Sequence, residues 1–100
     1  MPRNPKRRPK HPGALLREDV LPAAKISQTE LARRMGVSRL TVSELVHEKR
    51  AVSADIAHRL GRVFGNGPEL WLNLQKAVDL WEAFEANRRE YEKIEPLKAA

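Results

Sequence analysis

The sequence predicts a single all-α domain of five helices. Its 100 residues are enough for one modest hydrophobic core, since 41% of them are hydrophobic. Apolar residues recur at helical spacing through most of the chain, and serines able to cap helices precede three of these apolar runs. We therefore expect one helical domain over residues 13–95, preceded by an arm over residues 1–12 and followed by a tail over residues 96–100.

The predicted arm combines prolines with positive charge. Residues 1–12 hold four prolines and five lysine or arginine residues without one acidic residue. This composition cannot bury apolar surface and interrupts helices, so we expect a flexible segment. Two interpretations stay open: the arm contacts phosphates or lies in a nucleic-acid groove, or it serves only as a solubilising tail.

The first helix is expected to start at Gly13 and to end at Leu21. Leu16 and Val20, four residues apart, share the face that would turn toward the core. Pro22 is expected to end this helix, because a proline inside a helix removes a backbone hydrogen bond and clashes with the preceding turn.

A second and a third helix, joined by a short turn, form a predicted helix-turn-helix over residues 27–48. Ser27 and Glu30 fit a capping box, in which each side chain binds the other residue's backbone N–H. Gly36 suits the left-handed position that ends the second helix, and Ser38 can cap the third. The inward faces of the two helices are apolar: Leu31, Ala32, Met35, Val42, Leu45 and Val46.

This motif predicts double-stranded DNA as a partner. Its second helix enters the major groove, while its first helix braces it across the DNA backbone. Basic residues lie in or beside the motif and favour this interpretation: Arg33, Arg34, Arg39, Lys49 and Arg50. Pairs of capped helices also occur in bundles without DNA, so a helical adaptor that binds only protein remains an alternative.

The outward residues of the third helix are the candidates for base contacts. Arg39 can present two donors to guanine, and Leu40 can contact a thymine methyl group. Ser43 and Glu44 follow one turn later, although a surface ion pair with Arg39 or Lys49 is an equally open role for Glu44. The DNA backbone contacts are expected from Gln28, Thr29, Ser38, His47, Lys49 and Arg50.

Two further helices complete the predicted core. Ser53 can cap the fourth helix, whose apolar residues form one stripe: Ile56, Ala57, Leu60, Val63 and Phe64. Pro68 suits the first turn of the fifth helix, which is expected to run to Glu95, before Pro96, as the longest of the five.

The fifth helix carries two apolar lines. The wider line is expected to pack on the other helices and contains Leu70, Trp71, Leu74, Ala77, Val78, Trp81 and Phe84. The thinner line, broken by a lysine, is expected to form a dimer interface: Leu72, Lys76, Leu80 and Ala83. A dimer would place two DNA-reading helices about 34 Å apart, as successive major grooves require. Scattered exposed leucines are also normal in monomers, and that alternative stays open.

Composition and spacing speak against other classes of protein. The absence of cysteine excludes disulfides and thiolate metal sites, and the three histidines lack metal-ligand spacing. No nucleophile elbow, phosphate-binding loop or dinucleotide fingerprint is present, so we expect no enzyme, no cofactor and no metal. No apolar run approaches the ~18 residues of a membrane span. We expect a cytoplasmic protein without membrane association.

Three stretches of the chain are typical of one family. They are His11-Pro12-Gly13 with Leu16-Arg17-Glu18, the segment from Ser27 to Leu45, and Phe64-Gly65 followed by Glu69-Leu70-Trp71-Leu72-Asn73-Leu74-Gln75 and Asp79-Leu80-Trp81. Together they resemble HigA-type antitoxins, which belong to the Cro and phage-repressor group of helix-turn-helix proteins. The resemblance implies a lambda-repressor-like fold.

The resemblance also implies partners. HigA-type antitoxins are dimers that bind a palindromic operator in their own promoter and sequester a toxin, typically a RelE/HigB-like ribonuclease, and the resemblance implies the same partners for this chain. The family's base-contacting region falls on Arg39, Leu40, Ser43 and Glu44, and its backbone contact on Gln28. The proline-rich arm and the Gly67-Pro68 start of the last helix depart from the family pattern. A transcriptional regulator without a toxin would use the same DNA site and remains an alternative.

Overall fold

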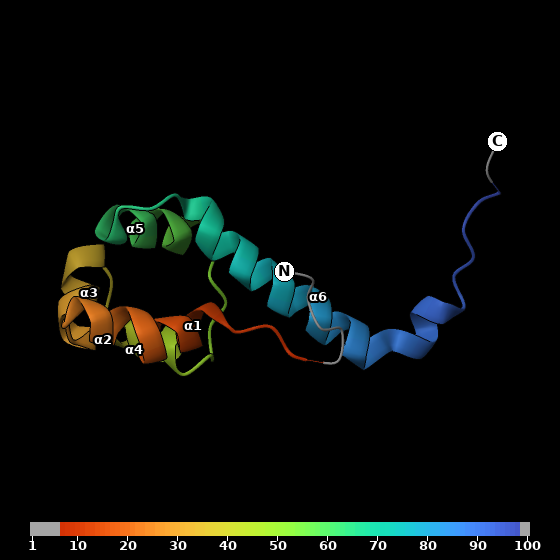
Figure 1. The fold of residues 1–100 in the computed structure, drawn as a ribbon, viewed down its shortest axis with the longest axis horizontal. Coiled ribbons are helices and arrows are strands. Elements are labelled where there is room, and N and C mark those ends of the chain that lie inside the picture. The colour runs from red at the N-terminus through yellow and green to blue at the C-terminus, as the bar shows by residue number, and fades with distance from the viewer. Residues whose placement is uncertain (1–6, 99–100) are drawn as a thin grey trace.

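The computed structural model describes residues 7–98, and the regular structure within them is entirely helical (Figure 1). Most of the predicted arm and the last two residues of the tail lie outside the described residues. The elements are α1 (Pro12–Leu15), the π-helical stretch η1 (Leu16–Val20), α2 (Leu21–Ala24), α3 (Gln28–Met35), α4 (Arg39–Val46), α5 (Ala54–Phe64) and α6 (Pro68–Glu92). Because α1, η1 and α2 join without a break, they form one rod, and the predicted five-helix fold is confirmed.

The first rod passes through Pro22 instead of ending before it, so the prediction that this proline ends the helix is wrong. In η1 the hydrogen bonds span five residues, and the Leu21 N–H reaches back to the Leu16 carbonyl. This wider turn accommodates the proline, which has no N–H to offer to the helix. The rod ends at Lys25, which adopts the left-handed conformation with φ of 57°.

Serine caps begin α3, α4 and α5, as the sequence predicts. Ser27 Oγ accepts a hydrogen bond from the Glu30 backbone N–H at 3.0 Å. Ser38 and Ser53 cap their helices in the same way. The second hydrogen bond of the predicted capping box, from the Ser27 backbone N–H to the Glu30 carboxylate, does not form. The Glu30 carboxylate instead binds two arginines of its own helix, Arg33 and Arg34. Gly36 ends α3 in the expected left-handed conformation, with φ of 72°.

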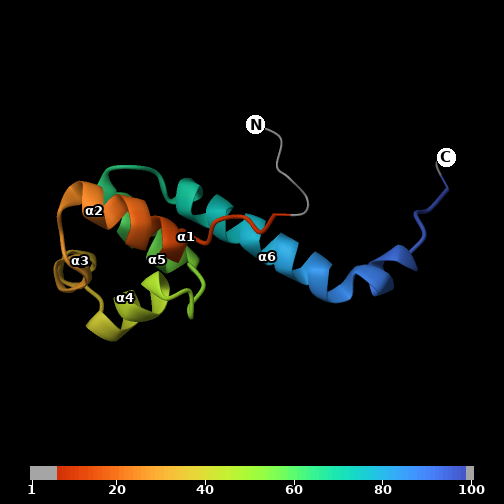
Figure 2. The same cartoon turned by 60° about the horizontal axis from the view of Figure 1, so that its bottom comes forward.

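The core lies where the rods meet. α3 packs on α4, α5 packs on the first half of α6, and α1 lies against the side of α4 (Figure 2). Trp71 of α6 is fully buried, and its indole N–H donates to the Asn66 side chain at 2.9 Å. Buried Gln75 ties α6 to the loop before α5, because its side-chain oxygen accepts the Val52 backbone N–H at 2.8 Å.

The expected core stripe of α6 is only partly buried. Trp71 and Val78 lie in the core, whereas Leu70 is 45% and Phe84 is 46% exposed. α6 projects beyond the body of the protein, and every residue after Trp81 is exposed up to the last described one (Figure 1). Apolar spacing alone does not distinguish a face that packs on a core from one that extends past it. The helix is also shorter than predicted, since it ends at Glu92 and not at Glu95. It is kinked at Asn87, where the backbone angles are not helical.

The N-terminal boundary of the domain lies earlier than predicted. His11 and Pro12, assigned to the arm, are buried, and Pro12 is the first residue of α1. His11 Nδ1 accepts a hydrogen bond from the Gly13 backbone N–H at 2.9 Å and caps this helix. The segment before His11 crosses α6 in the view of Figure 2, and Arg8 in this segment pairs with Glu82 of α6 at 2.8 Å.

Candidate nucleic-acid interface

α4 is anchored by its inner face and exposed along its outer face. Val42, Leu45 and Val46 are fully buried against the core. Arg39 and Leu40 begin the helix at the surface, and Leu40 is 67% exposed. An exposed leucine beside an exposed arginine at the start of a rigidly anchored helix can present an apolar group and a fork of donors to a partner.

The four predicted base-contacting residues lie on one side of α4. At about 100° per residue, Arg39, Leu40, Ser43 and Glu44 fall within an arc of about 140°. Arg39 and Leu40 are exposed, and Ser43 and Glu44 are half-buried. The structure therefore brings these side chains together on the outer face, with the two most accessible ones at the N-terminal end.

Glu44 forms an ion pair with Arg50, and not with Arg39 or Lys49 as the sequence analysis allowed. Its Oε1 accepts hydrogen bonds from Arg50 Nη2 at 2.8 Å and Arg50 Nε at 3.1 Å. The pair joins α4 to the loop that follows it. The pair engages one oxygen of Glu44 and two nitrogens of Arg50, so each side chain meets a base or a phosphate with its remaining atoms or after exchanging this contact.

His47 packs back on its own helix. Its Nδ1 lies 2.7 Å from the Ser43 carbonyl oxygen and 3.4 Å from Ser43 Oγ. Because the carbonyl only accepts, Nδ1 carries the proton in this contact. The exposed Nε2 edge of the ring is the part that can meet a phosphate.

The other predicted backbone contacts flank the outer face of α4. Gln28 and Thr29 form the first turn of α3, where unpaired backbone N–H groups and the helix dipole favour phosphate. Ser38 Oγ is engaged in capping, since it accepts the Thr41 N–H at 3.1 Å. Lys49 is exposed after the end of α4 and has no ion-pair partner within residues 7–98.

Part of the basic cluster in α3 is neutralised internally. The Glu30 carboxylate lies 2.6 Å from Arg34 Nε and also binds the Arg33 guanidinium. These two arginines lower the pKa of Glu30 to about 2, with Arg33 the larger cause. Because their charges are paired with Glu30, Arg33 and Arg34 support DNA binding less strongly than the sequence alone indicates.

Arg59 is a structural contributor that sequence reasoning missed. From α5 its Nη1 donates to the Met35 carbonyl at 2.8 Å and to the Gly36 carbonyl at 3.4 Å. These carbonyls end α3, so Arg59 holds the turn of the helix-turn-helix. Its partners are more than twenty residues away in the sequence, and no local pattern connects them.

The thinner apolar line of α6 borders a groove. Leu72, Lys76 and Leu80 line a hollow of about 580 Å³, together with Val52 from the loop before α5. Ala83 is exposed one turn further along α6. The predicted dimer residues thus share one accessible face.

Two other kinds of function find no support in the described part of the chain. Residues 7–98 contain no group of three histidine, aspartate or glutamate side chains that could hold a metal ion. None of the helices described here combines the length and the apolar character that crossing a membrane requires.

A family model described as "Helix-turn-helix" matches residues 16–72. The chain is 40% identical over 95 residues to antitoxin HigA-1 of Vibrio cholerae, and the aligned region covers 95% of this chain and 90% of that protein. It is also 40% identical over 88 residues to the uncharacterised HTH-type transcriptional regulator YbaQ of Escherichia coli K12, covering 88% of this chain and 77% of that protein.

Solved structures agree with these sequence relatives. The antitoxin HigA of Pseudomonas aeruginosa, solved with the higBA promoter, matches with a TM-score of 0.85 and 45% identity over 90% of this chain and 99% of that one. The antitoxin GraA, in complex with its operator, matches with a TM-score of 0.86 and 39% identity over 99% of this chain and 100% of that one.

Proposed function

The chain belongs to the helix-turn-helix family of HigA-type antitoxins, and from this premise we propose that it binds a palindromic operator as a dimer and represses its own operon. The observation that carries the proposal is the exposed start of α4, where Arg39 and Leu40 stand on a helix fixed by three buried residues. The operator and promoter complexes of similar antitoxins support DNA as the partner.

In this proposal α4 enters the major groove with its N-terminal end foremost. Arg39 donates two hydrogen bonds to guanine O6 and N7, and Leu40 contacts a thymine methyl group. Ser43 and Glu44 meet the next base edges, Glu44 after exchanging Arg50 for cytosine N4. Phosphate contacts come from the flanking residues: Gln28, Thr29, Ser38, His47, Lys49 and Arg50.

Dimerisation places two copies of α4 on successive major grooves. We propose that the groove along Leu72, Lys76 and Leu80, extended by Ala83, receives the same face of a second copy. Light scattering tests this arrangement: wild-type protein should be a dimer, and Leu80→Glu should shift it toward monomer. A wild-type monomer at every concentration contradicts the proposal.

We also propose that the protein neutralises a toxin, a HigB-type ribonuclease. The support is its similarity to proteins named as HigA antitoxins. Co-expression with the product of the neighbouring reading frame provides the test. Co-purification and relief of growth arrest are the expected results.

A transcriptional regulator without a toxin is the second candidate function. It is favoured by the similarity to a relative named as an HTH-type transcriptional regulator. Specific operator binding without any toxin in the neighbouring frame would select this alternative.

The central experiment titrates the protein with its own upstream DNA and with a scrambled duplex at two salt concentrations. We expect the native duplex to bind more tightly by a factor of about 10³ or more. Arg39→Ala should lose most of this margin. Arg62→Ala is the matched control, because it removes one exposed positive charge from α5, away from the start of α4.

Equal binding to both duplexes, fading as salt rises, contradicts operator recognition and leaves only a nonspecific attraction between charges. An Arg39→Ala variant with every activity intact would instead favour a helical adaptor that binds only protein.

A further inference from the structure

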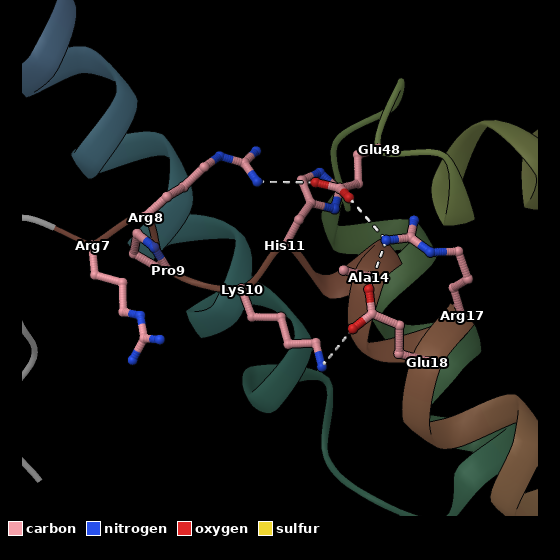
Figure 3. Close-up of a pocket in the computed structure, with 9 residues that line it drawn as sticks. All are labelled: Arg7, Arg8, Pro9, Lys10, His11, Ala14, Arg17, Glu18 and Glu48. Carbon is pink, nitrogen blue, oxygen red and sulfur yellow. Dashed lines mark hydrogen bonds and ion pairs between the residues drawn. The ribbon is translucent and has the colours of Figure 1, made fainter.

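Charged residues from distant parts of the chain meet at the C-terminal end of α4 (Figure 3). Glu48 Oε1 lies 3.0 Å from Arg8 Nη1, and Glu48 Oε2 lies 3.3 Å from Arg17 Nη2. Arg8 also reaches Glu82 of α6 at 2.8 Å, and Arg17 donates to the Val46 carbonyl in the last turn of α4. We call the two arginines and Glu48 the Glu48 latch.

Glu48 occupies an unfavourable backbone position. Its φ is 61°, in the left-handed region, where side chains with a Cβ are strained and glycine or asparagine is preferred. Strain of this kind persists where the surrounding structure holds it and often accompanies function. Both carboxylate oxygens of Glu48 are bound by arginines, so the side chain has a use that a glycine could not supply.

Lys25 is an informative contrast. It is the other non-glycine residue with positive φ in the described chain, at 57°. It ends the first helical rod at the surface and has no ion-pair partner within residues 7–98. Left-handed backbone ends a helix at both residues, because the N–H of each one and of the residue after it donate to carbonyls of the last turn. At Glu48 it also aims a carboxylate at two cations.

The C-terminal end of α4 is also packed tightly against the start of α1. A Cβ built on Gly13 would lie 1.7 Å from the Leu45 carbonyl oxygen, so the two backbones are in direct contact. Arg17 of η1 donates to the next carbonyl, that of Val46, whereas the Leu45 carbonyl accepts the Glu48 backbone N–H at 3.0 Å and only packs against Gly13. The chain that leaves this clamp carries Lys49, one of the residues proposed to contact phosphate.

We infer that Arg8, Arg17 and Glu48 are positioning residues for DNA binding. They fix the loop after α4, and with it Lys49, relative to the N-terminal end of the same helix. Arg8 also connects this loop to Glu82 of α6. The inference rests on the proposed function, and it assigns the latch no contact with DNA.

The sign of one substitution separates positioning from simple electrostatics. Glu48→Gly removes a negative charge from the neighbourhood of DNA, which by itself strengthens binding to phosphates. It also relieves backbone strain, which offsets the lost ion pairs and keeps the protein folded. If the latch positions Lys49, binding to the operator should instead weaken, by roughly 3- to 30-fold.

Three measurements test this inference. Lys25→Gly is the matched control, since it relieves similar strain without touching the latch, and its operator affinity should equal that of wild type. The salt dependence of operator binding by Glu48→Gly should fall by about one phosphate contact. In a double-mutant cycle, Lys49→Ala should cost little further affinity in the Glu48→Gly background, because its contact is already lost.

The outcomes distinguish the inference from the proposed function. Glu48→Gly binding the operator as tightly as wild type or more tightly, or additive effects with Lys49→Ala, overturns the latch and leaves operator recognition in place. A wild-type protein without preference for its operator overturns both.

Discussion

The two ends of α4 are held by contacts of different range. At the N-terminal end, Ser38 caps the helix by accepting the N–H of Thr41, three residues further along. At the C-terminal end, Arg17 reaches the Val46 carbonyl from 29 residues away, and Arg8 reaches Glu48 from 40 residues away. The start of α4 is thus capped by its own sequence, and Arg59 holds only the turn before it. The far end adds ion pairs and a hydrogen bond from distant residues to its local backbone hydrogen bonds.

The two ends of α4 should respond differently to substitution. A substitution at the start of α4 alters one cap or one exposed side chain, and its effect should remain local. A substitution at the far end disturbs α1, η1 and α6 at once, because all three contribute contacts there.

The largest effect is expected from Gly13→Ala at the clamped end. The added methyl group would overlap the Leu45 carbonyl, and neither backbone can yield without moving a helix. We expect a loss of about 1–3 kcal/mol in the free energy of unfolding, measured by urea denaturation. Gly67→Ala is the control, because its Cβ would meet only the flexible Glu69 carboxylate. Equal stabilities of the two variants would show that α1 and α4 are not in tight contact.

A smaller effect is expected from Ser38→Ala at the other end. Loss of one N-cap should lower the free energy of unfolding by about 1 kcal/mol. Ser53→Ala removes the corresponding cap of α5 and should have a similar effect, which thermal unfolding of both variants can check. A Ser38→Ala variant as stable as wild type would mean that another group caps α4.

The clamped end should also respond to pH through His11. Burial lowers the pKa of His11 below its usual value of 6.5, and Arg8 acts in the same direction, while Glu48, Glu82 and Asp79 oppose it. Since the unfolded chain binds this proton more readily, His11 contributes stability above pH 6.5 that is lost as the pH falls through the lower pKa of the folded state.

Protonation of Nδ1 would also remove the acceptor that caps α1. Urea denaturation at about pH 7.5 and about pH 5.5 should reveal this loss, and His11→Asn, which can cap without titrating, should reduce it. An unchanged pH dependence in His11→Asn would assign the loss to other groups.

The smallest effect on stability is expected from Leu40→Ala. Because this side chain is 67% exposed, the free energy of unfolding should change by no more than about 0.5 kcal/mol. The preference of the Leu40→Ala variant for the operator over scrambled DNA should nevertheless be smaller than that of wild type, as measured by competition titration. A destabilised variant would indicate that Leu40 belongs to the fold more than to the DNA-binding face.

Sequence reasoning succeeded where the physical cause is local. The caps at Ser27, Ser38 and Ser53 and the left-handed turn at Gly36 each depend on a few neighbouring residues, and all four are confirmed. The apolar faces of α3 and α4 follow in the same way from helical spacing. The candidate DNA-binding residues remain a prediction, although the structure places the four base-contacting candidates on one side of α4.

The errors arise where distant parts of the chain decide. Pro22 is accommodated by a π-helical turn that no proline rule anticipates. Phe84 continues an apolar stripe past the point where a core is available to cover it. His11 is buried where the start of α1 meets α4 and α6, and the partner of Glu44 depends on the path of the following loop.

The exposed end of α6 makes one continuous helix into two segments of unequal local stability. Between the second turn of α6 and Val78 the helix opens only when the core opens, so the amide hydrogens there exchange with solvent at the slowest rates. Beyond Trp81 each turn can fray without exposing anything that was buried, and exchange there proceeds independently of global unfolding. A partner that covered this end would therefore be detected first by slowed exchange near Arg88 and Arg89, with no change in the protection of the Val78 amide.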